Sequence, residues 1–314
     1  MSSSSSAELQ PRKYADGPPW IFTGRALYQL HLVKAEVARR IIPSELKVVQ
    51  AFGYTLGGFY LAKYDTSPAG VFDELVVLAG IVWNPPTSCA WAARVIVNSK
   101  EACDHGIEEV GLPSRTALFN SSRVSNEKRE SQRLWWNILP KIGGRNKGEE
   151  RSSDCYHAVD IVETDGSFRR PLCNIELLNN SAVLGIQDKG WVGPLMKMSL
   201  PSFSGKTKKQ PDLLKYSCRL NCRIRPVSPA RISPLQLTAE EEPRSTETQD
   251  LGTDVMSVLS GKPIVALAFE NMAMYVDAPT VVLARQEHAK IKEAHGLFSW
   301  FPRFKSPSVP APST

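Results

Sequence analysis

The sequence predicts a mainly β fold, which we expect to be a closed antiparallel β-barrel with a few short peripheral helices. About ten short segments show either two-residue alternation of apolar and polar side chains or a continuous apolar run. Few segments show helical periodicity. A closed barrel leaves no exposed strand edges, which favours closure for a chain with this many strands. With 314 residues, 42% of them hydrophobic, the chain can bury one sizeable core.

The first predicted strand, at residues 26–33, has one apolar face and one polar face. Its even-numbered residues are mostly apolar, whereas Gln29 and His31 occupy odd positions. In a barrel, we expect this polar face to border a ligand cavity. A short amphipathic helix at 34–42 follows and is ended by Pro43.

Further strands are predicted before residue 98. The segment 48–62 contains Gly57 and Gly58, a pair typical of a bulge or a close approach between backbones. Residues 76–83 are continuously apolar, as in a strand buried on both faces, and 89–97 forms the returning strand.

A short helix is predicted after the returning strand. Asn98 and Glu101 have the spacing of a capping box, with Asn98 as the N-cap residue. Gly106 can end this helix. The helix then leads the chain into a segment rich in glycine and proline.

A stiff bend is predicted at residues 108–115, whose sequence is E-E-V-G-L-P-S-R. Gly111 allows a positive φ, and Pro113 fixes its own φ while disfavouring a helical conformation at the residue before it. Such a bend can aim the side chains of Ser114 and Arg115. The pattern alone is consistent both with an ordinary turn between strands and with a functional site.

The chain is expected to form a single barrel domain at 18–285. A disordered tail at 1–17 precedes it, and the end of a charged helix with a Pro/Ser-rich tail follows at 286–314. Two polar stretches, at about 121–154 and 226–262, are predicted to be insertions, and the second is expected to be a mobile loop. The remaining predicted strands lie at 158–162, 173–178, 190–200, 213–225 and 264–276.

The composition excludes several classes of protein. The net charge is +6, but basic residues gather mainly in predicted loops, so no nucleic-acid partner is expected. The absence of any apolar run of about eighteen residues argues against a transmembrane helix. Six cysteines without a C-x-x-C pair predict a reduced, intracellular protein. Because His31, His105 and His157 are scattered, neither a metal nor another cofactor is expected.

Four residues of the bend region, Gly106, Glu108, Gly111 and Pro113, form a frame that resembles a segment of acetoacetate decarboxylases. In that family two lysines follow the proline, and the first forms a Schiff base with a keto acid. Ser114 and Arg115 stand at the two lysine positions here. The resemblance implies a decarboxylase-like barrel. It does not imply decarboxylation, because Ser114 has no amine and Arg115 stays protonated.

Longer stretches resemble the plant neoxanthin-deficient protein family. The resemblance implies a role in forming the carotenoid neoxanthin, and it leaves open whether that role is catalytic or accessory. The compartment is open as well: the pathway implies the chloroplast, whereas the lack of a clear transit peptide favours the cytoplasm. The stretches that carry the resemblance are 18–22, 24–36, 51–59, 65–77, 79–95 and 200–205.

The resemblance to decarboxylases also implies a candidate pocket. Arg25 and Glu74 match family positions, whereas Phe59 replaces a family glutamate. If burial raises its pKa, Glu74 could remove a vinylic proton of an epoxycarotenoid while Arg25 or Arg115 stabilises the departing oxygen. The alternative is a buried Arg25–Glu74 ion pair inherited with the fold. The candidate residues are Glu74, Arg25, Ser114, Arg115 and Glu108, with Phe59, Phe72 and Trp191 as apolar walls.

Two classes of function therefore remain. One is an enzyme, or enzyme subunit, that converts violaxanthin to neoxanthin; the other is a scaffold or an apolar-ligand-binding protein that works with another carotenoid-pathway protein. A long apolar tunnel that reaches Glu74 would favour ligand handling, and a filled interior would favour a scaffold. A homo-oligomer is expected because proteins of the decarboxylase fold commonly assemble. Peripheral membrane contact is predicted through Trp135, Trp136, Trp300 and Phe301, for which a satellite hydrophobic cluster or a partner contact is the alternative.

Overall fold

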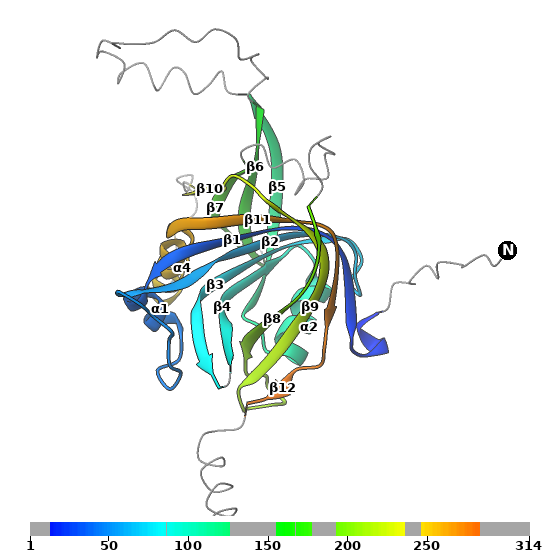
Figure 1. Cartoon of the computed structure of the whole chain (residues 1–314), viewed down its shortest axis with the longest axis vertical. Coiled ribbons are helices and arrows are strands. Elements are labelled where there is room, and N and C mark those ends of the chain that lie inside the picture. The colour runs from blue at the N-terminus through cyan, green and yellow to red at the C-terminus, as the bar shows by residue number, and fades with distance from the viewer. Residues whose placement is uncertain are drawn as a thin grey trace, which may run out of the picture.

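The computed structural model describes residues 13–85, 87–125, 155–166, 168–177, 193–235 and 246–282. It confirms the mainly β prediction: seven strands of the described chain close into a barrel (Figure 1). Around the barrel the order is β4, β3, β2, β1, β11, β9, β8 and back to β4. These strands are β1 (Trp20–Lys34), β2 (Tyr54–Thr66), β3 (Phe72–Asn84), β4 (Thr87–Val97), β8 (Leu195–Gly205), β9 (Leu214–Pro226) and β11 (Lys262–Val276).

The barrel is antiparallel except where it closes. There, β4 and β8 pair in parallel, through Ala90 with Ser202 and Trp91 with Phe203. The prediction of an antiparallel barrel is therefore wrong for this one pair. The reason is topological: the chain leaves the barrel after β4 and returns only as β8, so no hairpin sets the relative direction of the two strands.

A second arm of the sheet branches from β4. β5 (Ser114–Ser125) runs parallel to the end of β4, pairing Val95–Val97 with Ser114–Thr116. β6 (Cys155–Asp165), β7 (Phe168–Leu177) and β10 (Arg231–Pro234) then add in antiparallel order, and β12 (Thr280–Val281) pairs with β9.

The predicted insertions and tails are corrected in part. Of the stretch 121–154, residues up to 125 extend β5, and 126–154 lie outside the described residues. The stretch 226–262 is not a simple loop, because it contains β10 and the helix α4 (Thr246–Leu259). The segment is polar overall, so its sequence did not predict a helix. Its helix nevertheless buries one apolar face against the barrel, formed by Val255, Val258 and Leu259. The charged helix predicted near the C-terminus lies almost wholly outside the described residues.

The short helices lie at the edges of the barrel. α1 (Ala35–Ile41) confirms the helix predicted at 34–42. Before α2 (Lys100–His105), the N-cap residue is Ser99 rather than Asn98, because the Ser99 hydroxyl accepts a hydrogen bond from the Ala102 amide at 3.3 Å. The side chain of Asn98 is held by Asp73 instead. Among the described residues, no helix is long and apolar enough to cross a membrane.

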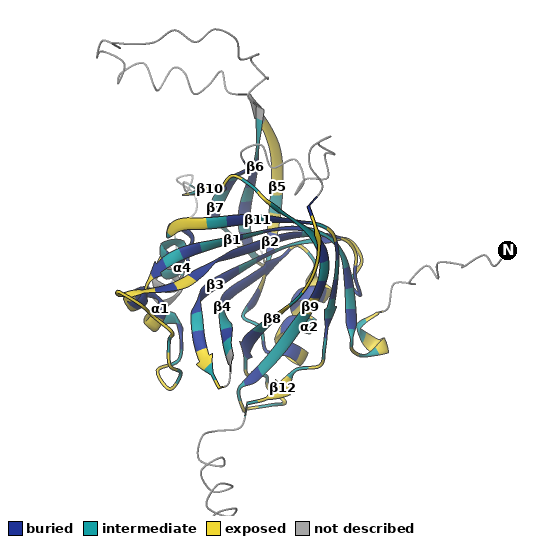
Figure 2. Ribbon diagram, in the orientation of Figure 1, coloured by how far each residue is buried: buried dark blue, intermediate teal, exposed yellow. Residues whose placement is uncertain are grey.

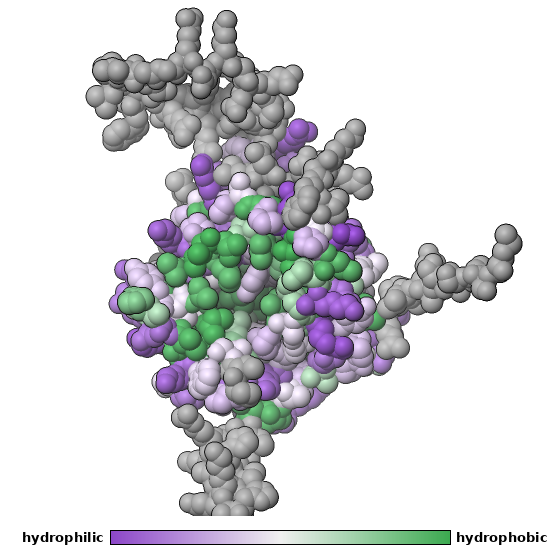
Figure 3. Space-filling model, in the orientation of Figure 1, coloured by the Kyte–Doolittle hydropathy of each residue, from purple (hydrophilic) through white to green (hydrophobic). Residues whose placement is uncertain are grey.

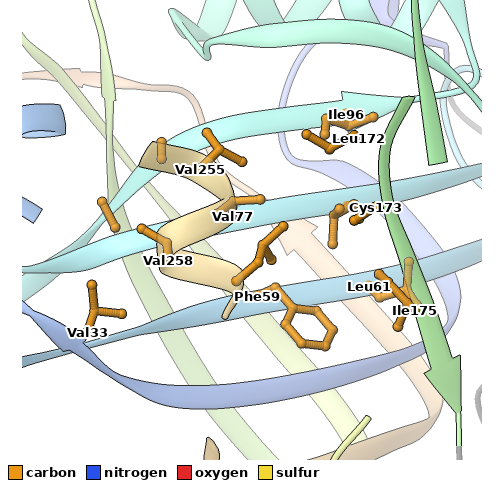
Figure 4. Close-up of a cluster of buried hydrophobic side chains, with 14 of the residues drawn as sticks. Val33, Phe59, Leu61, Val77, Ile96, Leu172, Cys173, Ile175, Val255 and Val258 are labelled. Atoms are coloured by element: carbon orange, nitrogen blue, oxygen red, sulfur yellow. The ribbon is translucent and has the colours of Figure 1, made fainter. Parts of the chain in front are cut away.

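The strands β1–β4 bury most of both faces, whereas β8 and β9 keep more of their residues half-buried or exposed (Figure 2). On β2, Tyr60 points into the barrel, whereas Phe59 and Leu61 point outward. The outward side chains of β1–β4 pack against β6, β7 and α4 to form an outer core (Figure 4). The inner and outer faces of one strand thus belong to two separate hydrophobic clusters.

The polar face of β1 does not border the cavity, contrary to prediction. Gln29 and His31 point into the outer core and are each only 1% exposed. The Gln29 amide contacts His31 Nε2 at 2.8 Å and accepts a hydrogen bond from the Ala230 amide at 2.7 Å, while His31 Nδ1 lies 3.2 Å from the Val258 carbonyl. These buried polar groups hold α4 and the start of β10 to the barrel.

A buried ion pair sits where the sheet branches. Arg94 Nη1 on β4 lies 3.1 Å from Glu163 Oε1 on β6, and the two side chains are 7% and 10% exposed. On β4, Arg94 falls between Trp91, which pairs with β8, and Val95, which pairs with β5. The pair therefore links the barrel to the second arm.

Arg94→Met is expected to lower the free energy of unfolding by roughly 3–5 kcal/mol, because it leaves the Glu163 carboxylate buried without its partner. The double variant Arg94→Met/Glu163→Leu is expected to recover most of that loss. Urea unfolding of the wild type, both single variants and the double variant measures this. A double variant as unstable as the sum of the single variants would contradict the interpretation.

Gly58→Ala is expected to destabilise the barrel by at least about 3 kcal/mol. Gly58 has φ +133°, and an added Cβ would lie 2.0 Å from the Gln29 carbonyl oxygen on the neighbouring strand β1. Gly53→Ala is the matched control: its φ of +80° is also unfavourable, but nothing lies within 4 Å of the added atom. Thermal unfolding should show a much smaller change for the control, and equal losses would show that φ alone matters.

Candidate functional site

The barrel encloses an elongated apolar cavity of about 250 Å³. Phe72 and Ile81 both line it. At roughly 3.3 Å per residue, these two residues are separated by about 30 Å along β3. Hydrophobic side chains also gather in the middle of the face shown in Figure 3. The interior therefore contains an apolar cavity whose lining extends along much of β3.

Glu74 is the acidic residue of this cavity. It lies on the inward face of β3, and its Oε2 accepts a hydrogen bond from the Tyr64 hydroxyl at 2.7 Å. Burial raises the pKa of Glu74 to about 7, although the Tyr64 hydrogen bond opposes the rise. No lysine or arginine is among the described residues that line the cavity. Near neutral pH the carboxyl group can therefore both accept and release a proton.

Tyrosine side chains surround Glu74. Burial raises the pKa values of Tyr60 and Tyr64 well above the ordinary range, and the charge of Glu74 raises them further. Both hydroxyls are therefore protonated in the resting protein near neutral pH. The ring of Tyr64 packs between Phe22 and Phe72, with ring centroids 5.1 and 4.9 Å away, and the Tyr60 hydroxyl lies 3.1 Å from the sulfur of Met272. Packing thus fixes the position of the Tyr64 hydroxyl group, which donates the hydrogen bond to Glu74.

Three aromatic side chains that line the cavity, from three different segments, pack against one another. Tyr14 belongs to a short 3-10 turn at Tyr14–Asp16, within the predicted disordered tail. Its ring stacks on His105 of α2 with centroids 3.7 Å apart, and Trp20 meets the same imidazole edge-on at 4.5 Å. The prediction of a disordered tail is therefore wrong for residues 14–16, because these contacts place them.

The bend at 108–115 brings one of its two predicted side chains to the cavity. α2 continues into a π-helical turn at Gly106–Val110, and Gly111 has φ +77°, as the prediction of a bend requires. Ser114 then starts β5, buried and facing the cavity. Arg115 and Glu108 are exposed to solvent, and Arg115 donates a hydrogen bond to the Ser114 carbonyl at 3.3 Å.

Arg25 also lies away from Glu74. A bulge between Gly24 and Ala26 interrupts the register of β1 at this point. The Arg25 guanidinium forms an ion pair with Asp65 at 3.2 Å instead of the Arg25–Glu74 pair considered from the sequence. Of the predicted apolar walls, Phe72 lines the cavity and Phe59 lies in the outer core.

Several predicted residues cannot be placed. Trp191 lies outside the described residues, and so do Trp135, Trp136, Trp300 and Phe301. Sequence reasoning missed Tyr14, Tyr60, Tyr64 and the cavity position of His105. The tyrosines at 60 and 64 share the even-numbered face of β2, and assigning Phe59 of the opposite face to the cavity hid this signal.

Three plant relatives are similar over most of the chain. "Protein NEOXANTHIN-DEFICIENT 1" of Oryza sativa subsp. japonica is 49% identical over 290 residues, covering 89% of this chain and 93% of its own. The protein of that name from Solanum lycopersicum is 50% identical and covers 85% and 93%, and the one from Arabidopsis thaliana is 49% identical and covers 88% and 98%. No family model matches the sequence.

Two solved structures are similar to the chain at low sequence identity. Acetoacetate decarboxylase from Legionella pneumophila has a TM-score of 0.48 and 12% identity, covering 91% of this chain and 100% of that one. The enduracididine biosynthesis enzyme MppR complexed with pyruvate has a TM-score of 0.45 and 11% identity, covering 88% and 93%.

Glu74→Gln is expected to reduce the pH dependence of stability. The folded state holds the Glu74 proton with a pKa of about 7, above the ordinary 4.5, so its contribution is complete at low pH and is lost as pH rises through about 7. At pH 8 the variant should therefore be more stable than the wild type by up to about 3 kcal/mol, and at pH 4.5 nearly equal to it.

Urea unfolding at pH 4.5, 6 and 8 measures this difference. Glu36→Gln is the control, because the Glu36 side chain on α1 is 70% exposed. The control should follow the wild type at every pH. If Glu74→Gln also follows the wild type, the raised pKa of Glu74 is contradicted.

Proposed function

The chain belongs to the NEOXANTHIN-DEFICIENT 1 family, and we propose that it acts in neoxanthin formation by holding the epoxide-bearing end group of a carotenoid against Glu74. The observation that carries the proposal is the apolar cavity that contains one ionisable carboxyl group with a pKa of about 7. The family name supports the pathway, and the cavity supports direct handling of its pigment.

The shape of the cavity suits an extended ligand. A carotenoid is a linear polyene that carries an oxygenated ring at each end, and the cavity is apolar, with lining residues spread along β3. Its volume of about 250 Å³ is below the roughly 300–1,000 Å³ of pockets that enclose drug-sized ligands. We therefore place one end ring and part of the polyene inside the barrel, with the rest outside it.

The chemistry required is an isomerisation, so it needs no second reactant. In the catalytic form of the proposal, the Glu74 carboxylate removes the vinylic proton next to the epoxide. The electron pair of that C–H bond forms the new double bond of the allene, and the carbon–oxygen bond of the epoxide breaks. The Tyr64 hydroxyl gives its proton to the departing oxygen, which becomes a hydroxyl group.

The hydrogen bond between the two residues closes the cycle. At 2.7 Å, the proton gained by Glu74 can pass to the tyrosinate of Tyr64, which restores both groups. This assignment replaces Arg25 and Arg115, considered from the sequence, because Arg25 is paired with Asp65 and Arg115 is exposed.

A second candidate function is binding without catalysis. It is favoured by the lack of any lysine or arginine among the described cavity residues, since a developing alkoxide is then stabilised by neutral hydroxyl groups alone. In this form the protein presents one end of the pigment to another protein of the pathway.

Incubation of the purified protein with violaxanthin in lipid micelles, followed by pigment chromatography, tests the proposal. In the catalytic form neoxanthin accumulates with the wild type, Glu74→Gln abolishes it, and Tyr64→Phe lowers the rate about 100-fold, the scale of one general acid. Glu36→Gln should behave as the wild type.

Quenching of tryptophan fluorescence separates the remaining outcomes, since Trp20 lines the cavity. Saturable violaxanthin binding without conversion assigns the protein to the non-catalytic form. The absence of both binding and conversion would overturn the proposal in either form.

A further inference from the structure

The cavity contains a polar atom that the protein itself leaves without a partner. His105 lines the cavity, and its Nε2 is buried with no hydrogen-bond partner in the described part of the chain. Buried side-chain nitrogen atoms are normally paired, because an unpaired one is destabilising. An exception that borders a ligand cavity points to a partner supplied by the ligand.

The imidazole is held in a fixed position. Tyr14 covers one face of the ring at an interplanar angle of 15°, and Trp20 meets it at 83°. The two aromatic residues are themselves linked, since the Trp20 indole donates a hydrogen bond to the Tyr14 carbonyl at 3.3 Å. This packing fixes the plane of the imidazole ring and therefore the region of the cavity in which its edge lies.

The chemistry of the ring selects the kind of partner. Burial lowers the pKa of His105 to about 4, although the nearby Glu109 opposes the shift, so the imidazole is neutral at physiological pH. A neutral imidazole does not offer the positive charge that would favour a carboxylate or a phosphate. It pairs well with a hydroxyl group, which can donate or accept and therefore fits either tautomer.

His105 lies in the same region as Glu74. Tyr14 stacks directly on His105, and Tyr14 is close enough to Glu74 for the carboxylate to raise the tyrosine pKa, after the larger effect of burial. Both His105 and Glu74 line the one cavity. Through Tyr14, His105 thus belongs to the part of the cavity that also holds Glu74.

We infer that His105 Nε2 binds the ring hydroxyl group of the carotenoid end group whose epoxide faces Glu74. This rests on the proposed function and adds a specificity: the cavity selects rings that carry a hydroxyl group as well as an epoxide. Glu74 and Tyr64 recognise the reacting oxygen, and His105 recognises the oxygen that does not react.

Four pigments and the variant His105→Phe test the inference, with His105→Gln as the rescue variant. The probes in detergent micelles are violaxanthin, with hydroxyl and epoxide groups; zeaxanthin, with hydroxyl groups alone; β-carotene diepoxide, with epoxide groups alone; and β-carotene, with neither. The variant is His105→Phe, which keeps an aromatic ring between Tyr14 and Trp20. Affinity is measured by tryptophan quenching.

His105→Phe should weaken violaxanthin and zeaxanthin binding about tenfold, the scale of one hydrogen bond, and leave β-carotene and its diepoxide unchanged. His105→Gln, which restores a hydrogen-bonding group, should recover part of the loss. Unchanged affinity for the two pigments without hydroxyl groups also shows that the variant is folded.

The outcomes separate this inference from the proposed function. If the wild type binds violaxanthin and His105→Phe weakens all four pigments equally, or none of them, the role of His105 is overturned while pigment handling stands. If the wild type binds none of the four pigments, the proposed function fails and the inference fails with it.

Discussion

The structure depends on β4, the strand at which the sheet branches into the closed barrel and the second arm. β4 pairs with β3 along its length, with β8 at Ala90 and Trp91, and with β5 at Val95–Val97. A strand has two edges, so the edge opposite β3 must be shared between two partners at successive positions. The contact with β8 closes the barrel around the cavity, and the contact with β5 starts the arm that covers the outer core. The buried Arg94–Glu163 pair lies between these two contacts and joins the two halves of the fold.

The second arm explains how the barrel can keep an open interior. A cavity removes packing contacts from the side chains that line it. Here the same strands also bury their outward side chains against β6, β7 and α4, so their position does not depend on the inner face alone. The side chains around Glu74 can therefore serve a ligand, because packing on the opposite face holds their strands. The hydrogen bond from Tyr64 is fixed for the same reason.

Much of the fold was predictable from local sequence patterns. The alternation of the strands, the helix ended by Pro43 and the bend at Gly111 are all properties of short segments, and each is found in the structure. The resemblance to decarboxylases supplied the barrel, and it also drew attention to Glu74 and Ser114, both of which line the cavity. These features depend on residues that are close together in the sequence or matched as a motif.

The failures share a different physical cause. A strand that is buried on both faces gives no hydropathy signal for which face is inside, so Gln29, His31 and Phe59 were assigned to the cavity although they belong to the outer core. The bulge at Arg25 depends on pairing with β11, a strand more than two hundred residues away. Likewise, α4 becomes a helix whose apolar face is defined by the barrel that it covers. None of these can be decided within a local window.

The use of both faces of β2 also limits how the protein can vary in length. Tyr60 and Tyr64 face the cavity only because Phe59 and Leu61 face the other way. Insertion or deletion of one residue inside this strand would exchange the two sets, placing phenylalanine and leucine beside Glu74 and forcing tyrosine hydroxyl groups into an apolar core. Evolution can therefore substitute residues within β2, but changes in chain length must fall in the connections between strands.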